Sequence, residues 1–591
     1  MKSGIIRAAG LFLPVIIVGW GCLYTAPVPE PAYASPSEPI VEKGEMQNPT
    51  LDEVLTIAAV DPLQKIFRES SFFPDKRAAA EAARGEYASF QFAVRSGRTI
   101  RGLSARVEAP RFGAAVLGGA TVRFVGYVKS SRRAPEPSHD RLVPLSGYFP
   151  DPLLECAAVD VPRDCTQPIW ITIPVSKDAA PGVYEGRVVF SGRIEGKTFR
   201  VFEPVSIKVF PVTITKTRLW VTNWFFLEPP TLGLIDGGKP PEKFSPRYWE
   251  LVRILARKMK DYLQNVAWVH PLDLVKFARS GSRWSFDFGD FDKMVSLLIE
   301  EGVAGRIEGG HIGGRVGDWE SPFAVNVPVI KPEGTVLEKR AVSDPAAAAF
   351  YTQFIPALMS HLREKEWDGI YLQHIADEPT AANNRSYGEI AAFIKGLAPG
   401  LKIIEACHSK DVGGVINVWV PQLNYFADDL AFYQGRQKAG DEVWFYTCLA
   451  PQGEYPNRFI ELPLLKTRYV HWLNFRYGAT GYLHWGFNAW HHAIDQDPFS
   501  ETSDVQEGGS TLPGGDAWIV YPGTGNVLSS IRLEAMRDGI FDHELLMMIE
   551  DRQPEKGQEL CRKLVKSFTN YDLDIKSFRR IRTRVLELLS Q

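Results

Sequence analysis

The pattern of hydrophobic and polar positions changes along this chain, and the change predicts two architectures. Between residues 51 and 214, short runs alternate with a period of two and are separated by turn residues such as Ala180-Pro181-Gly182. Such alternation is typical of strands with one buried face. With no helical pattern between the runs, it predicts an antiparallel β-sandwich domain over residues 51–214. The expected strands are 87–96, 121–128, 168–175, 182–190 and 202–212.

From residue 215 onward, apolar runs alternate with segments of helical periodicity. Ser245-Pro246 is a good N-cap and first-turn proline for one helix, and Asp290 is expected to cap the next. The expected strands are 218–226, 264–269, 303–308, 369–375, 401–406, 416–420, 443–449 and 481–485. Alternating strands and helices predict a (β/α)8 TIM-like barrel over residues 215–591. A doubly wound open sheet is the alternative, although no Gly-x-Gly-x-x-Gly or Walker pattern follows a strand.

The end of the chain reads as a C-terminal helical extension. Residues 530–546 form a charge-rich helical pattern, which is more typical of a docked, ion-paired structural helix than of a site. The amphipathic tail that follows, as far as Gln591, is expected to cover the outer wall of the barrel.

The segment YLQHIADEP, residues 371–379, places two adjacent carboxylates at the end of the fourth barrel strand. Pro379 has no N–H for a ladder, and it is expected to hold Glu378 in an extended backbone conformation. Active sites of such barrels form at the carboxyl ends of the strands, and paired carboxylates suit glycoside hydrolysis. We therefore predict Asp377 and Glu378 as catalytic residues. An exposed Asp-Glu turn without function is the alternative.

Polar and aromatic residues also collect after the other strands, among them Trp268 and His270 after the second and Arg315 and Trp319 after the third. A rim of this composition suits a sugar ring, whose C–H face stacks on aromatic rings while its hydroxyl groups hydrogen-bond. The residues predicted to contact substrate are His311, His374, Trp419, Gln422, Tyr446, Trp485, Asn488 and Trp490.

The composition of the chain limits the classes of molecule that it is expected to bind. The 591 residues carry a net charge of −3 and no long basic run, which argues against nucleic acid. The spacing of cysteine and histidine matches no zinc site, and we expect neither a metal nor another cofactor. A glycan or glycoconjugate is the expected partner, and the sequence predicts no oligomeric state.

The N-terminus predicts export. Lys2 and Arg7 precede an apolar run from Leu11 to Val18, which is a secretory signal pattern and too short for a convincing membrane span. Cleavage near Ala34 is favoured, so that residues 1–34 are a signal peptide and 35–50 a linker. Lipid attachment at Cys22 is the alternative, and the expected location is secreted or extracytoplasmic.

Several motifs together resemble glycoside hydrolase family 123, the β-N-acetylgalactosaminidases and their relatives. They are IADEP at 375–379, WVPQ at 419–422, GYLHWGFNAW at 481–490, WIVYPG at 518–523 and SIRLEAMRDGIFDHELL at 530–546. The resemblance implies a β-sandwich in front of a (β/α)8 barrel and a retaining, substrate-assisted mechanism. It places the acid/base on Glu378 and the residue that orients the substrate's acetamido group on Asp377.

The residues themselves separate this mechanism from the commoner one. Related barrel glycosidases place a second glutamate after strand 7 as nucleophile, about 5–5.5 Å from the acid. Here the nearest acid, Glu454, lies several residues into the loop. The substrate's 2-acetamido oxygen is then the expected nucleophile. The alternatives are another sugar specificity, a non-catalytic carbohydrate-binding protein, and a metalloenzyme that uses His491, His492 and Asp495.

Overall fold

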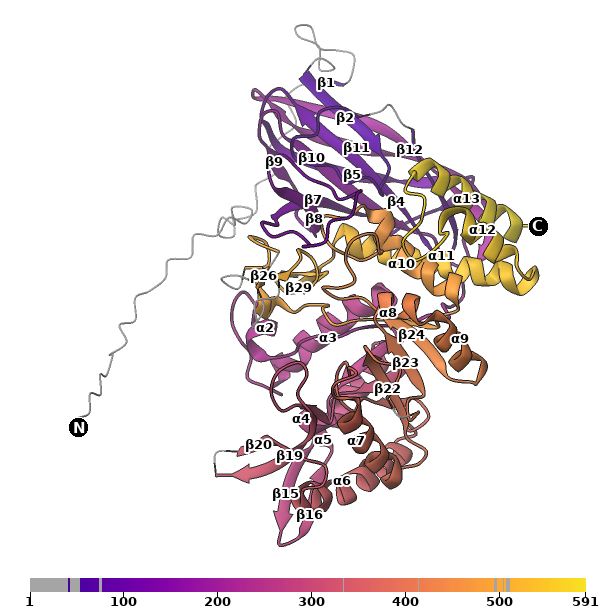
Figure 1. Ribbon diagram of the computed structural model, residues 1–591. Helices are drawn as coiled ribbons and strands as arrows, with labels where there is room; N and C mark the ends of the chain where they lie inside the picture. The colour runs from indigo at the N-terminus through magenta and orange to yellow at the C-terminus, as the bar shows by residue number, and fades with distance from the viewer. Residues whose placement is uncertain are drawn as a thin grey trace. The chain divides into compact units, whose positions relative to one another are not determined.

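The structure is a computed structural model, and it describes residues 41–42, 54–73, 77–332, 334–412, 414–493, 497–502, 504–505 and 511–591. Figure 1 shows the described elements. The predicted signal peptide, Cys22 and most of the predicted linker lie outside these ranges, and so does Asp495. Within them, no helix combines the length and apolar character that crossing a membrane requires.

Two sheets form the N-terminal domain, as predicted, and most of their strand pairs are antiparallel. One sheet contains β1 (Val41–Glu42), β3 (Ala78–Arg84), β5 (Ile100–Phe112), β6 (Ala115–Val116), β9 (Val159–Val161), β11 (Gly182–Ile194) and β12 (Lys197–Thr213). The other contains β2 (Leu55–Val60), β4 (Tyr87–Ser96), β7 (Thr121–Lys129), β8 (Tyr148–Leu154) and β10 (Thr166–Pro174). Their inner faces pack together, and the rings of Phe92 and Phe190 meet edge to face at 5.2 Å.

Eight parallel strands form the second sheet system, and every strand predicted for the barrel is present. In spatial order they are β13 (Trp220–Asn223), β25 (Gly481–His484), β24 (Glu442–Tyr446), β23 (Val418–Pro421), β22 (Lys402–Cys407), β21 (Tyr371–Gln373), β17 (Arg306–Gly309) and β14 (Val266–Val269). The sheet nearly closes between β13 and β14. There the Asn265 side chain donates to Leu219 O at 2.9 Å and accepts from Val221 N at 2.8 Å. The barrel, rather than the open sheet, is confirmed.

Helices surround the barrel and extend beyond it (Figure 1). Ser245 caps α3 by accepting a hydrogen bond from Tyr248 N, as predicted. The prediction for Asp290 is wrong, because α5 begins at Gly289 and places this carboxylate in the first turn. The helices are α2 (Pro229–Gly233), α3 (Pro246–Asp261), α4 (Pro271–Leu274), α5 (Gly289–Glu300), α6 (Pro345–Glu364), α7 (Asn384–Leu397), α8 (Leu423–Asp428), α9 (Leu430–Lys438), α10 (Leu464–Tyr477), η1 (Trp490–His492), α11 (Ile531–Arg552), α12 (Lys556–Leu564) and α13 (Ile575–Leu589).

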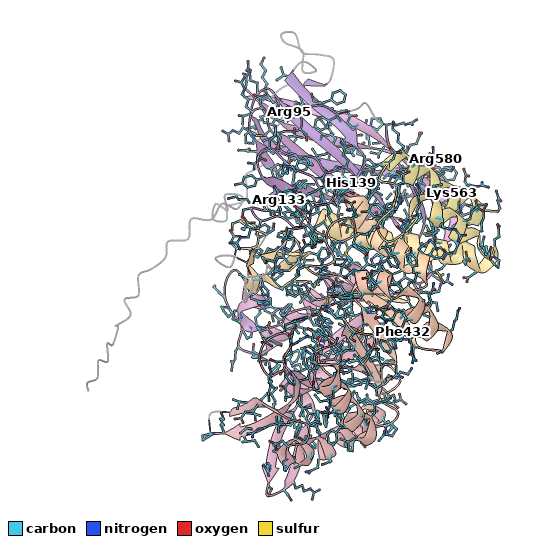
Figure 2. The ribbon with its side chains drawn as sticks, in the orientation of Figure 1. Arg95, Arg133, His139, Phe432, Lys563 and Arg580 are labelled. Carbon is cyan, nitrogen blue, oxygen red and sulfur yellow. The ribbon has the colours of Figure 1, made fainter. Side chains whose placement is uncertain are left out.

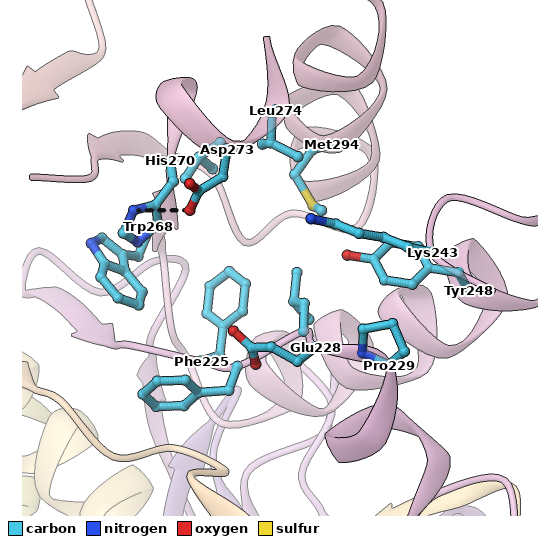
Figure 3. Close-up of a pocket in the computed structure, with 13 residues that line it drawn as sticks. Phe225, Glu228, Pro229, Lys243, Tyr248, Trp268, His270, Asp273, Leu274 and Met294 are labelled. Carbon is cyan, nitrogen blue, oxygen red and sulfur yellow. Dashed lines mark ion pairs between the residues drawn. The ribbon is translucent and has the colours of Figure 1, made fainter. Parts of the chain in front are cut away.

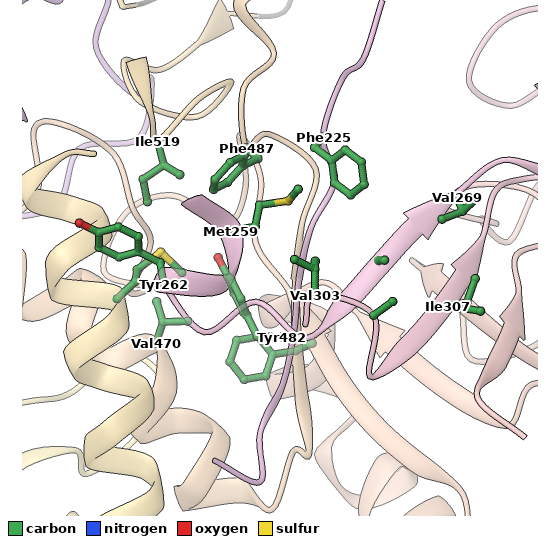
Figure 4. Packing of buried hydrophobic residues seen from close by; sticks show 14 of the residues in the cluster. Phe225, Met259, Tyr262, Val269, Val303, Ile307, Val470, Tyr482, Phe487 and Ile519 are labelled. Carbon is green, nitrogen blue, oxygen red and sulfur yellow. The ribbon is translucent and has the colours of Figure 1, made fainter. Parts of the chain in front are cut away.

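Short strands decorate the loops of the barrel. They are β15 (Lys276–Ser280), β16 (Arg283–Asp287), β18 (Gly313–Arg315), β19 (Phe323–Lys331), β20 (Gly334–Arg340), β26 (Asp504–Val505), β27 (Thr511–Leu512), β28 (Tyr521–Gly523) and β29 (Asn526–Leu528). Strands β18–β20 form a sheet inserted after β17. The hydrophobic core runs continuously from the barrel strands into the flanking helices, as Figure 4 shows for Val269, Ile307, Tyr262 and Val470.

Helix α11 joins the barrel to the sandwich through buried ion pairs. Arg532 pairs with Asp151 of β8 at 2.8 Å, and Glu534 pairs with Arg123 of β7 at 2.8 Å. The expectation of a docked, ion-paired structural helix is thereby confirmed. Each of these charges needs its partner, because an unpaired buried charge is costly.

The C-terminal tail packs on a helix of the barrel's outer wall, as predicted, and it also contacts the sandwich. Phe578 of α13 lies against Trp472 of α10, the helix between β24 and β25. In addition, Arg582 pairs with Glu86 of the sandwich, and Arg579 pairs with Asp61 at 2.7 Å. Thr583 also donates to Glu81 of β3. An amphipathic pattern shows that a helix has a buried face and does not identify the surface that buries it.

Candidate active site

The Asp377-Glu378 pair lies in the loop that follows β21, at the carboxyl end of the strand. Glu378 has a φ of +51°, so the prediction of an extended backbone at this residue is wrong. Such a conformation is strained for a residue other than glycine and persists only where its surroundings hold it. Glu378 N donates to Ala406 O at 3.0 Å, and Arg315 donates to the carbonyls of Asp377 and Glu378 at 3.1 and 2.8 Å.

The carboxylate of Glu378 faces strands β22 and β24. Tyr446, at the end of β24, donates its hydroxyl proton to Glu378 Oε1. The Tyr446 oxygen accepts in turn from His408 Nε2 at 2.7 Å and from Gln422 Nε2 at 3.2 Å. Burial alone would raise the pKa of Glu378, but the bonds from His408 and Tyr446 and the charge of Arg315 outweigh it and lower that pKa.

The carboxylate of Asp377 faces the other way, toward β17. Its Oδ1 lies 3.7 Å from His311 Nε2, in the loop after that strand. The side chain is 44% exposed, so the carboxyl is crowded by protein and still open to water. Desolvation by the surrounding protein and the negative charge of Glu378 raise the pKa of Asp377 to about 6. Neighbouring carboxylates thus differ in the ease with which they lose a proton.

A fully buried charge network lies beneath Asp377. His374 bonds through Nε2 to Glu308 of β17 and through Nδ1 to Glu405 of β22, both at 2.7 Å. Burial would lower the pKa of His374, but the two carboxylates outweigh it and raise the pKa to about 10. The positive charge of His374 likewise outweighs burial at Glu405 and lowers its pKa to about 2. His374 is therefore an imidazolium held between two carboxylates.

His311 connects this network with Asp377. Its Nε2 lies 3.5 Å from Glu405 Oε1 and 3.7 Å from Asp377 Oδ1, yet it makes no well-aligned hydrogen bond within the described part of the chain. The ring packs 4.6 Å from that of His374. A buried ring nitrogen of this kind is available to a substrate group or a water molecule.

Four of the residues predicted to contact substrate lie at the mouth of the barrel. They are His311, Gln422, Tyr446 and Trp485. Trp485 follows β25, is half-buried, and donates from Nε1 to the buried carboxyl of Asp516 at 3.2 Å. This bond fixes the plane of the indole, as a sugar platform requires.

The other four predicted contacts are fully buried, and each bonds to another part of the chain. His374 belongs to the charge network, and Trp419 donates to Asp441 on the outer side of the barrel at 2.9 Å. Asn488 bonds both backbone groups of Phe226, and Trp490 Nε1 donates to Val520 O at 2.8 Å. None of the four has an exposed surface on which a sugar can lie.

Sequence reasoning missed Glu308, Glu405 and His408, and it noticed Arg315 without giving it a role. The signal for the two glutamates was present, because each interrupts a buried apolar strand, RIEG and KIIEAC. A carboxylate in such a position must have a charged partner. His408 follows directly after a barrel strand, as the predicted rim residues do.

A cavity of about 220 Å³ opens beside the site, at the ends of β13 and β14 (Figure 3). Trp268 and His270 lie between it and His311, since Trp268 stacks on Trp224, whose ring is 5.5 Å from His311. Neither Asp377 nor Glu378 lines it.

Two groups of described side chains have the spacing of metal ligands. In the group of His311, His374 and Glu405, both ring nitrogens of His374 already bond to carboxylates. In the group of His139, Asp140 and Glu454, the ammonium of Lys466 lies 3.0 Å from Asp140. In each group, a carboxylate is thus already paired with a cationic side chain, His374 in the first and Lys466 in the second.

Two family models match this chain. A family model described as the glycoside hydrolase 123 catalytic domain matches residues 242–549, more than half of the chain. A second, the glycoside hydrolase 123 N-terminal domain, matches residues 68–191. No curated protein matches the chain.

Among solved structures, a family 123 glycoside hydrolase from Clostridium perfringens, studied for glycolipid glycan hydrolysis, is similar over nearly its whole length. It is 15% identical, with 91% of this chain and 97% of that chain covered and a TM-score of 0.70, which shows the shared fold. A β-D-glucuronidase from Dictyoglomus thermophilum is more distant, at 9% identity, 77% and 66% coverage and a TM-score of 0.31. With a sandwich, a nearly closed barrel and both family domains in place, this chain belongs to glycoside hydrolase family 123 and is a glycosidase.

Proposed function

We propose that this glycosidase removes β-linked N-acetylgalactosamine from glycans, with retention of configuration and with the substrate's own 2-acetamido oxygen as nucleophile. The observation that carries this proposal is the position at the end of β24, where a protein nucleophile would be expected. Tyr446 occupies it and donates to Glu378. Glu454, the acid farther along the loop, bonds instead to His139 of the N-terminal domain at 2.6 Å. Figure 2 labels His139 among the side chains of the molecule.

The buried carboxylates do not replace the missing nucleophile. Glu405 accepts hydrogen bonds from the backbone of Ile375 and Ala376 at 2.8 and 3.1 Å, in addition to its bond with His374. Glu308 accepts from Thr222 and from His374. Both are fully buried, so neither reaches the anomeric carbon of a bound sugar.

The proposed reaction has two steps. In the first, the acetamido oxygen attacks C1, the C1–O bond breaks, and Glu378 gives its proton to the departing oxygen. Asp377 holds the amide N–H while positive charge develops on the resulting oxazoline. In the second, Glu378 takes a proton from water, the water oxygen attacks C1 from the face that the leaving group left, and the acetamido group is restored.

The pKa directions add a condition to this scheme. At rest, the raised pKa of Asp377 and the lowered pKa of Glu378 mean that Asp377 takes up a proton more readily, whereas the acid of the first step is Glu378. An amide N–H that donates to Asp377 stabilises its anion, and a glycosidic oxygen that accepts from Glu378 stabilises its acid form. The proposal therefore requires bound substrate to raise the pKa of Glu378 above that of Asp377.

A panel of aryl β-glycosides tests the mechanism. Aryl N-acetyl-β-galactosaminide is expected to be cleaved at least a hundredfold faster than aryl β-galactoside, because only the first carries the nucleophile. Equal rates would refute participation of the acetamido group, and a faster glucosamine epimer would change the specificity alone. Activity that is lost to a chelator and restored by a divalent ion would favour the metalloenzyme alternative.

We also propose that the protein is exported, on the signal pattern of residues 1–34. Mass spectrometry of the mature protein from an expressing bacterium tests this. Cleavage near Ala34 is expected, a diacylglycerol on Cys22 would indicate a lipid anchor, and an intact Met1 on the protein in the cytoplasm would contradict export.

A further inference from the structure

We propose that Trp319 forms the platform of a leaving-group subsite, on which the sugar released from the cleaved bond stacks through its C–H face. The inference rests on the proposed function above and adds to it the chemistry of the group attached to the cleaved sugar: a neutral hexose rather than a small alcohol. Trp319 lies between β18 and β19, in the sheet inserted after β17.

The exposure of Trp319 is the first observation. Its side chain is 48% exposed, and no other tryptophan of the described residues is a large exposed hydrophobic. Single exposed apolar side chains are common on proteins and need no function. The way in which this one is held, and what it lies beside, distinguish it from a chance exposure.

The loop that carries Trp319 is anchored from two sides. Trp319 O accepts from Arg315 Nε at 2.8 Å and from Asn383 Nδ2 at 3.1 Å. Asn383 is buried, and its Oδ1 accepts from Thr380 N at 2.8 Å, two residues after Glu378. The backbone of Trp319 therefore belongs to a bonded unit that includes the catalytic loop, and little backbone entropy is lost when a ligand stacks on the indole.

Arg315 supports both the indole and the carboxylate pair. Its guanidinium carbon lies 3.8 Å from the centroid of the Trp319 ring, which is a close cation–π contact. The same guanidinium donates to the carbonyls of Asp377 and Glu378. Because Arg315 covers the indole on one side, a ligand meets the part of the ring that remains open to water.

Trp319 lies on the Glu378 side of the pair. The rings of Trp319 and His408 are 5.6 Å apart, and His408 Nε2 is 3.4 Å from Glu378 Oε1. A general acid must come within about 2.6–3.2 Å of the oxygen that it protonates. The leaving group must then lie beside Glu378, where Trp319, His408 and Tyr425, whose ring is 4.8 Å from His408, form an aromatic wall.

The composition of the aromatic wall favours an uncharged leaving group. The positive charge of Arg315 is already engaged by three backbone carbonyls, so an anionic sugar finds no free cation on this guanidinium. Aromatic rings beside one histidine suit a neutral hexose, which presents an apolar C–H face and hydroxyl groups.

Two substrates that differ only in the leaving group test the inference. One is the methyl β-glycoside of N-acetylgalactosamine, and the other is the disaccharide in which galactose replaces methyl and adds a face that can stack. Both leaving groups need a proton, so Glu378 serves both equally. Trp319→Ala is expected to lower kcat/KM for the disaccharide about tenfold more than for the methyl glycoside. Trp319→Phe, which retains an aromatic ring, should keep most of the wild-type activity on the disaccharide. Val316→Ala, at an exposed position of the same loop, should behave as wild type on both substrates.

An equal loss on both substrates in Trp319→Ala would overturn the platform and leave the proposed function intact. A wild type that cleaves another sugar would overturn the proposed specificity instead. The same pair of substrates, built on that other sugar, then tests the platform unchanged.

Discussion

Asp377 and Glu378 are adjacent in the chain, yet their carboxyl groups meet different surroundings. Glu378 accepts a hydrogen bond from the hydroxyl of Tyr446 and lies beside His408, and its pKa is lowered. Asp377 faces His311, with the buried carboxylate of Glu405 behind it, and its pKa is raised to about 6. Because the two side chains point in opposite directions from the end of β21, each carboxyl serves a different half of the barrel's mouth.

The contrast shows that the order of the two pKa values in the free enzyme does not by itself identify the general acid. A general acid is commonly identified by a raised pKa, and here that residue would be Asp377. Its neighbour Glu378, however, lies beside the aromatic wall on which we propose that the leaving group stacks. Under the proposed mechanism, bound substrate rather than the resting pKa order decides which of the two carboxyls carries the proton.

The buried network behind Asp377 gives the largest expected change in stability. Glu405→Gln leaves the His374 imidazolium with one charged partner, and removing one partner of a buried pair costs about 3–5 kcal/mol of unfolding free energy. Urea denaturation measures it. Glu389→Gln, which breaks the exposed pair with Arg385, serves as control and should cost less than about 1 kcal/mol. Equal small losses would mean that His374 is neutral.

The same network predicts a dependence of stability on pH. The pKa of His374 is raised from 6.5 to about 10, so its contribution is complete below pH 6.5 and is lost as pH rises through 10. The urea midpoint of the wild type should fall across this window. His374→Gln should show a flatter profile there, and identical profiles for both proteins would remove His374 as the titrating group.

Tyr446→Phe should act on the other half of the site, with a smaller effect on stability. The change removes the hydroxyl that donates to Glu378, so the pKa of Glu378 should rise. The active enzyme carries one proton on the pair, and Glu378 is the more acidic carboxyl, so protonation of both groups at low pH follows the pKa of Glu378 and the acidic limb of kcat/KM should move to higher pH. Tyr433→Phe, a buried tyrosine of α9, is the control. An unchanged limb would show that Glu378 does not set it.

The sequence predicted the sandwich, all eight barrel strands and the position of the carboxylate pair, because period-two and period-3.6 patterns survive folding. The sequence did not predict which residues are buried by segments that lie far away along the chain. Trp490 matches a sugar-binding aromatic by position, but the segment around Val520 buries it. Similarly, the positive φ of Glu378 depends on Arg315, which lies more than sixty residues earlier in the chain.

The division of labour between Asp377 and Glu378 is tested most directly by kcat/KM of Glu378→Ala and Asp377→Asn across a series of leaving groups of increasing pKa. Glu378→Ala should lose about 10²–10⁴-fold on glycans and poor leaving groups, and far less on aryl groups of low pKa that depart without a proton. Asp377→Asn should lose a similar factor on every substrate. A steep dependence for Asp377→Asn beside a flat one for Glu378→Ala would reverse the roles, and wild-type rates for both would contradict the account.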